Sequence, residues 1–312
     1  MKPGVIKAVK QLLARRIPNI DNLTLSWFGG EPLLAKDIML DIGEFAQRTC
    51  AAHGVSLVGH TTTNSYLLTP SLLEQLMAIS HAEFQITLDG DQEWHDRTRV
   101  LANGAGTFEK LWTNLQSYRS IAGHFQIFLR LHVHRDNVES MKRLYERLNR
   151  ELLDDPRFSA GFHKVSWLGS RPISENLLEE PDYLDALGYI TGDSQAVRQP
   201  GSGISEYHIT EYVCYAAKPN SLMIRANGRI GKCTVAIDDE RNDVGRLNED
   251  GTLNIFEERL RKWFAGFANP TLETLGCPLA NLEPLRPNEV TVSVRDIRVA
   301  DTLQPRPANV TA

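Results

Sequence analysis

Trp27-Phe28-Gly29-Gly30-Glu31-Pro32 is the most informative stretch of the sequence for the fold, because it marks where a strand ends and a loop begins. The residues that lead into it, 23–28, are mostly apolar or β-branched and are typical of a buried strand. The two glycines let the backbone adopt positive φ and approach a ligand closely. Glu31 then places a carboxylate at the carboxyl end of the strand, where open α/β sheets bind ligands. The stretch therefore predicts a ligand-binding loop.

Around this loop, strands and helices alternate through the first half of the chain. We predict five strands, which begin near residues 23, 55, 83, 125 and 162, with helices that include 5–16, 36–52 and 137–153. Strands joined by helices of this length form right-handed crossovers, so all five strands are expected to be parallel. The predicted fold class is α/β, an incomplete, barrel-like parallel sheet with outer helices.

The second half of the chain has a different composition. Residues 169–206 are rich in Pro, Ser, Gly and acidic residues, and we interpret them as a linker with one helix near 183–190. Residues 207–312 hold three of the four cysteines and several short β-like pieces. We therefore expect a partial barrel over 1–168 and a small cysteine-bearing domain, with a loosely packed tail, over 207–312.

Composition places the chain among ordinary soluble globular proteins. It has 312 residues, of which 42% are hydrophobic and 23% charged. A net charge of −5 with mixed signs gives no electrostatic footprint for nucleic acid. No apolar run has the length of a membrane span and no export signal is evident, so we expect a cytoplasmic protein with no membrane partner. Four cysteines in such a chain favour metal ligands or inert thiols over disulfides.

Polar residues also end the strands that follow the Glu31 loop. Thr61-Thr62-Thr63-Asn64 ends one strand, and Thr87-Leu88-Asp89-Gly90 ends the next. Each segment alone is an ordinary turn sequence. Because parallel strands end at the same edge of a sheet, the three segments together predict a ligand rim that suits the ribose and amino-acid end of a nucleoside cofactor.

Cys214, Cys233 and Cys277 form the second group of interest. A thiolate at each end of a hairpin-like unit, with an Asn227-Gly228 turn between, could bring two sulfurs to one iron–sulfur cluster. The alternative is three buried, inert thiols. Cys50 sits on a helical stretch and is interpreted as a core thiol.

Two further pairs of residues are candidate sites. His95 and Asp96 suggest acid–base chemistry, but a structural role in the loop after Asp89 is favoured. His132 and His134 share a strand face and could form a metal pair, although spacing names no third ligand, so zinc is disfavoured.

The order of WFGGEPLL, TTTN-YLL, QITLDG-QEWHDRTR, G-GTFEKL and LRLHVHRDN resembles that in radical SAM peptide maturases of the SPASM class, which include the anaerobic sulfatase-maturating enzymes. The resemblance covers residues 5–168. It implies a radical SAM barrel and a peptide- or protein-modifying activity that uses a 5′-deoxyadenosyl radical. It also implies a reductant such as flavodoxin or ferredoxin.

The same resemblance implies which residues bind S-adenosylmethionine. Gly29, Gly30 and Glu31 would face the methionine amine, and Asn64, Thr87, Asp89 and Arg130 would lie near the ribose and carboxylate. For Arg130, a strand-end salt bridge is an equal alternative.

In the C-terminal half, the C-x13-G-x4-C spacing from Cys214 to Cys233 resembles the opening of a SPASM domain. It implies an auxiliary [4Fe-4S] cluster with Cys277 as a third ligand. No cysteine follows Cys277, which removes a second auxiliary cluster and leaves the fourth position open. An open iron, a ligand such as His208 or Asp238, and an empty site are all compatible with this pattern.

The cluster motif that these enzymes carry before the GGEP strand, C-x3-C-x2-C, does not occur in the sequence. We expect that Met1 is an internal methionine, that the chain is N-terminally truncated, and that it is inactive alone. A non-catalytic peptide-binding scaffold or pseudoenzyme is the alternative. A weaker one is an unrelated α/β enzyme that uses Glu31 and Asp89 as acid–base carboxylates.

Overall fold

The computed structural model of the chain describes residues 1–165, 177–193, 213–268, 270–282 and 295–296. The chain forms two compact units. The first, called here the sheet unit, is Leu13–Tyr212. The second, called the cysteine unit, combines Met1–Leu12 with Val213–Ala312.

A five-stranded parallel sheet forms the centre of the sheet unit, as predicted. Its spatial order follows the chain, so every strand pairs with the next one. Its strands are β1 (Asn22–Trp27), β2 (Ser56–Thr63), β3 (Glu83–Leu88), β4 (Gln126–Val133) and β5 (Phe158–Lys164). Right-handed crossovers that always step in one direction put all helices on one face, as in a barrel. This confirms the predicted fold class.

One strand boundary differs from the prediction. β5 begins at Phe158, four residues before the expected start near 162. Its first residues, Phe158-Ser159-Ala160-Gly161, are mostly small or polar and carry little of the apolar pattern by which strands are recognised. The predicted continuation to residue 168 lies mostly outside the described residues.

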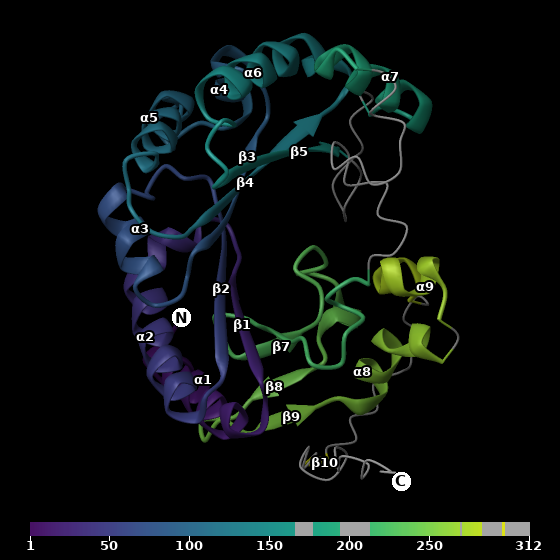
Figure 1. Cartoon of the computed structure of the whole chain (residues 1–312). Helices are drawn as coiled ribbons and strands as arrows, with labels where there is room; N and C mark the ends of the chain where they lie inside the picture. The colour runs from purple at the N-terminus through teal and green to yellow at the C-terminus, as the bar shows by residue number, and fades with distance from the viewer. Residues whose placement is uncertain (166–176, 194–212, 269, 283–294, 297–312) are drawn as a thin grey trace, which may run out of the picture. The chain divides into compact units, whose positions relative to one another are not determined.

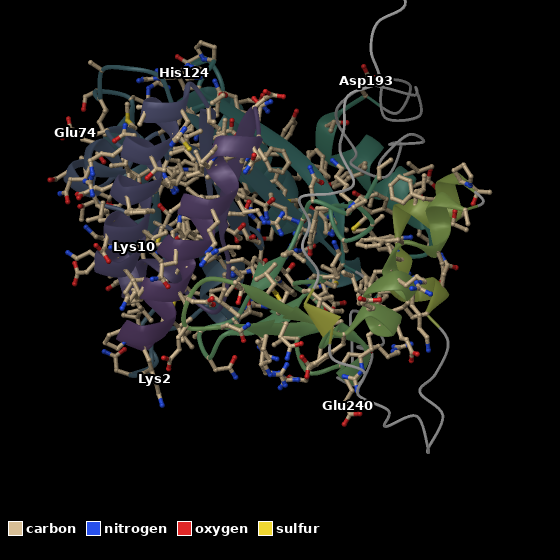
Figure 2. All side chains as sticks on the ribbon, turned by 90° about the horizontal axis from the view of Figure 1, so that it is seen from below. Lys2, Lys10, Glu74, His124, Asp193 and Glu240 are labelled. Carbon is tan, nitrogen blue, oxygen red and sulfur yellow. The ribbon has the colours of Figure 1, made fainter. Side chains whose placement is uncertain are left out.

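Helices connect the strands and cover one face of the sheet (Figure 1). After α1 (Pro3–Arg16), which precedes the sheet, they are α2 (Lys36–His53), α3 (Pro70–Met77), α4 (Gln92–Thr98), α5 (Phe108–Tyr118), α6 (Val138–Glu151) and α7 (Glu180–Thr191), with the 3-10 turns η1 (Ile17–Asn19), η2 (Pro32–Ala35) and η3 (Arg135–Asn137). Side chains such as Glu74 of α3 lie on the outer surface (Figure 2). α7 agrees with the helix expected within the predicted linker, most of which lies outside the described residues.

Local sequence explains where these helices begin and end. The Thr69 hydroxyl accepts a hydrogen bond from the Leu72 N–H, and Pro70 occupies the first turn of α3. Gly54 follows α2 with a left-handed φ of +69°, which ends the helix.

The two faces of the sheet have opposite character. Along β3 and β4, buried residues alternate with half-buried ones. Ile86, Leu129 and Leu131 face the helices and are fully buried. The intervening positions carry polar residues such as Thr87, Arg130 and His132. In a parallel sheet with apolar core on both faces, each strand would be apolar at nearly every position. The alternation seen here instead gives the sheet one apolar face, which the helices cover, and one polar face.

The cysteine unit contains short antiparallel strands in the order β10-β9-β8-β7-β6. They are β6 (Met223–Ile224), β7 (Arg229–Gly231), β8 (Gly245–Leu247), β9 (Leu253–Ile255) and β10 (Arg295–Asp296), with the helices α8 (Glu257–Trp263) and α9 (Leu272–Gly276) and the 3-10 turns η6 (Glu240–Asn242), η7 (Ala265–Phe267) and η8 (Pro278–Asn281). Ile230, Val244 and Trp263 are central to its small apolar core.

The predicted Asn227-Gly228 turn joins β6 to β7. Gly228 has a left-handed φ of +82°, and the Arg225 and Arg229 backbones close the turn.

Within the described residues, no helix combines the length and apolar character that crossing a membrane requires.

Candidate functional site

Glu31 is held at the carboxyl end of the sheet by three donors. Its Oε1 accepts hydrogen bonds from the Leu33 N–H (3.0 Å) and the Thr63 hydroxyl (2.8 Å). Its Oε2 accepts from the Asn64 N–H (2.8 Å). The bonds to Thr63 and Asn64 tie the loop after β1 to the end of β2, so the carboxylate position is set by two neighbouring strands. It remains half-buried, with acceptor capacity left for a ligand.

The glycines before Glu31 leave open space beside the backbone. Gly29 has a φ of +153°, which side chains rarely adopt, and a Cβ at Gly29 or Gly30 would meet no atom within 4 Å. Phe28, just before them, is 49% exposed. The loop therefore offers bare backbone and an exposed ring next to a carboxylate. The prediction of a buried strand over 23–28 is wrong in this respect, because β1 ends at Trp27 and alternates exposed with half-buried positions.

Asn64 lies beside Glu31, and its side chain makes a hydrogen bond within its own turn. Its Oδ1 accepts a hydrogen bond from the Tyr66 N–H (2.9 Å), which forms a tight turn after β2. Through its backbone N–H, Asn64 is a direct partner of Glu31.

Thr87 and Arg130 are neighbours on the polar face of the sheet. They are paired across β3 and β4 in register. The Arg130 guanidinium contacts Nε2 of His163 on β5, a residue that the sequence did not single out. His163 also packs near His132, with ring centroids 5.7 Å apart. The strand pairing thus brings an arginine and two histidines together on this face.

Asp89, at the end of β3, is engaged in ion pairs. Its carboxylate accepts from Arg99 Nε (2.5 Å) and lies 3.2 Å from His132 Nδ1, with the side chain 14% exposed. Burial alone would raise the pKa of Asp89, but hydrogen bonds from His132 and Arg99, with the Arg99 charge, hold it well below its usual value. Asp89 is therefore an ionised carboxylate that anchors Arg99 and His132 of its own chain.

His95 and Asp96 hold the loop between β3 and α5, in agreement with the structural role that the sequence favoured. Asp96 Oδ1 accepts from the N–H groups of Thr107 and Phe108 at the start of α5. His95 is 1% exposed and lies between the Asp89 N–H (3.5 Å) and the Thr107 hydroxyl (3.3 Å). Burial lowers the pKa of His95 to about 4, so its imidazole is neutral near pH 7.

His132, on β4, and His134, which lies just after the end of that strand, have different partners. Burial lowers the pKa of His132 although Asp89 raises it, and His132 pairs with Asp89. His134 packs against the Trp94 ring, with centroids 5.4 Å apart. In the described parts of the chain, no group of three or more His, Cys, Asp and Glu residues is arranged to hold a metal ion.

In the cysteine unit, the segments that carry the three thiols are tied together. The Cys214 N–H donates to the Leu275 carbonyl (3.0 Å), close in sequence to Cys277. The Tyr215 hydroxyl bonds to the Thr234 hydroxyl (2.6 Å), next to Cys233. Burial raises the pKa of Cys214, and charge interactions with Cys233 and Cys277 raise it further.

A buried cation, missed by sequence reasoning, accompanies these thiols. Lys232 is fully buried. Its Nζ donates to the carbonyls of Lys218 (2.6 Å) and Ser221, and lies 4.9 Å from the centroid of the Phe264 ring. Burial lowers the pKa of Lys232 to about 8, although Cys214 raises it. An ammonium group thus lies near thiols that would be anionic as metal ligands.

Solved structures of anSMEcpe, an anaerobic sulfatase-maturating enzyme, have a similar fold. Native anSMEcpe with bound AdoMet and the Kp18Cys peptide gives a TM-score of 0.58 at 15% identity, over 85% of this chain and 75% of that chain. Histidine-tagged anSMEcpe with bound AdoMet gives 0.59 at 14% identity, over 85% and 72%. The chain has a radical SAM fold.

This likeness confirms, for the fold, the resemblance to radical SAM peptide maturases that the motifs indicated. No family model and no curated protein sequence matches the chain. The similarity is therefore one of architecture, and the roles of individual residues depend on their own geometry.

Proposed function

We propose that the chain is a radical SAM protein by descent, which binds S-adenosylmethionine at the Glu31 loop and has a peptide or protein as its partner. The position of the Glu31 carboxylate carries this proposal, because it is fixed at the strand ends and keeps acceptor capacity for an ammonium group. When bound to a reduced iron–sulfur cluster, S-adenosylmethionine would supply the 5′-deoxyadenosyl radical that abstracts a hydrogen atom.

Each residue around the loop has a role in this proposal. Glu31 accepts from the methionine amine, while Gly29 and Gly30 let the ligand approach the backbone. Asn64, Thr87, Asp89 and Arg130 surround the ribose and carboxylate. Asp89 acts there mainly by fixing Arg99 and His132, since its oxygens already accept bonds from both.

The cysteine unit is proposed to be a SPASM-like domain with one auxiliary [4Fe-4S] cluster on Cys214, Cys233 and Cys277. The tied thiol segments and the buried Lys232 support this. The thiolates of a four-iron cluster bind different irons and stand further apart than the ligands of a single metal ion. The lack of a single-ion site among the described residues therefore does not argue against a cluster.

A peptide or protein partner is supported by the structures of anSMEcpe with the Kp18Cys and Cp18Cys peptides. In this chain, the polar face of the sheet offers hydrogen-bonding side chains beside the Glu31 site. We further propose that this chain alone does not cleave S-adenosylmethionine, because none of its four cysteines forms a C-x3-C-x2-C motif.

The test measures binding and turnover separately on the full chain. Equilibrium dialysis with S-adenosylmethionine is expected to give saturable binding. After anaerobic reconstitution with iron and sulfide, a 5′-deoxyadenosine assay with dithionite is expected to give no product. Absence of binding would overturn the cofactor assignment, and product from this chain alone would overturn the proposed inactivity. Tight peptide binding by an iron-free Cys214→Ser/Cys233→Ser variant would instead indicate a non-catalytic scaffold.

A further inference from the structure

The turn that carries Asn64 is held from behind by buried polar groups of α5. Ser65 has a φ of +62°, a left-handed backbone that is unfavourable for a residue with a side chain. It is also fully buried. Such a turn persists only where its surroundings hold it, and two residues of α5, Asn114 and Tyr118, contact it.

Both contacts are specific hydrogen bonds. Asn114 Nδ2 donates to the carbonyls of Ser65 (2.8 Å) and Tyr66 (3.3 Å). The Tyr118 hydroxyl donates to the Leu68 carbonyl and accepts from the Ser65 hydroxyl (3.0 Å). Asn114 is 2% exposed and Tyr118 fully buried. Burial raises the pKa of Tyr118, so the phenol keeps its proton and remains a donor.

From this turn, the hydrogen bonds continue without a gap to the candidate carboxylate. The Ser65 N–H donates to the Thr63 hydroxyl (3.1 Å), which donates to Glu31 Oε1 (2.8 Å). The N–H of Asn64, between them, donates to Oε2 (2.8 Å). The orientation of both donors thus depends on the backbone of Ser65, and so on α5.

We infer that Tyr118 and Asn114 are positioning residues for the Glu31 site, which fix the turn whose donors orient the carboxylate toward its ligand. This inference deepens the proposed function and rests on it for the identity of the ligand. Neither side chain touches the ligand itself. Their effect is transmitted through Ser65, Thr63 and the Asn64 amide.

The first test uses hydrogen exchange, which needs no ligand. Tyr118→Phe keeps the ring but removes the hydroxyl, and the Asn64 and Ser65 amides are expected to exchange about tenfold faster, measured by NMR. Tyr189→Phe is the matched control, because it removes an exposed phenol that bonds to Glu139. Unchanged protection of Asn64 in the Tyr118→Phe protein would overturn the inference. Should that variant not fold, Asn114→Ala, which removes the amide that donates to the Ser65 and Tyr66 carbonyls, is expected to accelerate the same amides, and unchanged protection would overturn the inference equally.

The second test is a double-mutant cycle on S-adenosylmethionine affinity. Tyr118→Phe is expected to raise the dissociation constant about fivefold in the wild type and to have almost no effect in a Glu31→Gln background. A purely structural role for Tyr118 would give the same fold-change in both backgrounds and overturn the inference. If the wild type binds no S-adenosylmethionine, the proposed function fails, while the exchange experiment still decides whether α5 fixes the turn.

Discussion

The two candidate cofactor sites differ in what holds their functional groups. Glu31 accepts three hydrogen bonds from its own chain, supported by a further layer of bonds from α5. The free thiols of the cysteine unit range from buried Cys233 to exposed Cys277, on a scaffold of very short strands. One site is preorganised by the protein, whereas the geometry of the other depends more on what the thiols bind.

The strongest test of this contrast removes two thiols. In a Cys214→Ser/Cys233→Ser variant, iron bound after anaerobic reconstitution is expected to fall from about four atoms per chain to almost none, because hydroxyls do not replace thiolates as cluster ligands. Iron and sulfide analysis measures this. Cys50→Ala is the control and should bind as much iron as the wild type. Full iron retention in the double variant would show that these thiols are inert.

A large loss of stability is expected in the sheet unit when Asp89 becomes Asn. Arg99 and His132 would lose a buried charged partner, which is expected to lower the free energy of unfolding by about 3 kcal/mol at pH 7. Urea denaturation measures the difference. Asp154→Asn, which breaks an exposed pair with Arg119, serves as control and should change stability little. A loss no larger than the control's would contradict the anchoring role of Asp89.

The same variant has a predicted pH dependence. Hydrogen bonds and the Arg99 charge outweigh burial and hold the folded pKa of Asp89 below its ordinary value of about 4. Its contribution to stability is therefore present above about pH 4 and is lost as the pH falls through the folded pKa. The wild-type and Asp89→Asn unfolding curves should stay apart from pH 8 to pH 5 and converge only in stronger acid. If the two curves converged near neutral pH, the pH dependence would follow the titration of His132 rather than that of Asp89.

A smaller effect, on binding, is expected for Glu31→Gln. Loss of one charge-assisted hydrogen bond to an ammonium group corresponds to about 2 kcal/mol, or roughly a thirtyfold rise in the dissociation constant for S-adenosylmethionine. Calorimetric titration measures this rise. Glu93→Gln, in an exposed pair on α4, should leave the affinity unchanged. Equal affinity for the wild type and Glu31→Gln would remove Glu31 from the site.

The smallest effect concerns the support of Glu31. Thr63→Val keeps the shape but deletes the hydroxyl that links Ser65 to Glu31, and should cost about 1 kcal/mol of stability with a severalfold weaker affinity. Thr113→Val is the matched control, because it removes an exposed hydroxyl that bonds to the Glu109 carbonyl within α5. If the two variants bind equally well, the preorganisation of Glu31 does not depend on this hydroxyl.

Sequence reasoning was most successful where pattern alone determines structure. The five parallel strands follow from alternating strands and helices, and the Asn227-Gly228 turn from its dipeptide. It placed Asn64 beside Glu31 because adjacent parallel strands end at the same edge. It had less success at β5, where Ser159, Ala160 and Gly161 give no apolar signal.

Contacts between distant residues could not be predicted in this way. Asp89 was expected near the cofactor, yet its oxygens accept bonds from Arg99 and His132, a pairing that depends on how the loop after β3 folds back. Ser65 and Tyr118 are 53 residues apart, and an aromatic residue in an amphipathic helix gives no sign of where its hydroxyl points. Lys232 reads as a surface residue in sequence because lysine is rarely buried.

The buried thiol of Cys50 can be used to measure how often the sheet unit opens. Cys50 is 1% exposed on α2, and burial raises the pKa of its thiol, so in the folded state alkylating reagents meet no accessible thiolate to react with. Its labelling rate therefore reports how often the sheet unit opens. Mass spectrometry of alkylated peptides would separate this signal from that of exposed Cys277, so a single chain could reveal the opening kinetics of one unit and the thiol chemistry of the other.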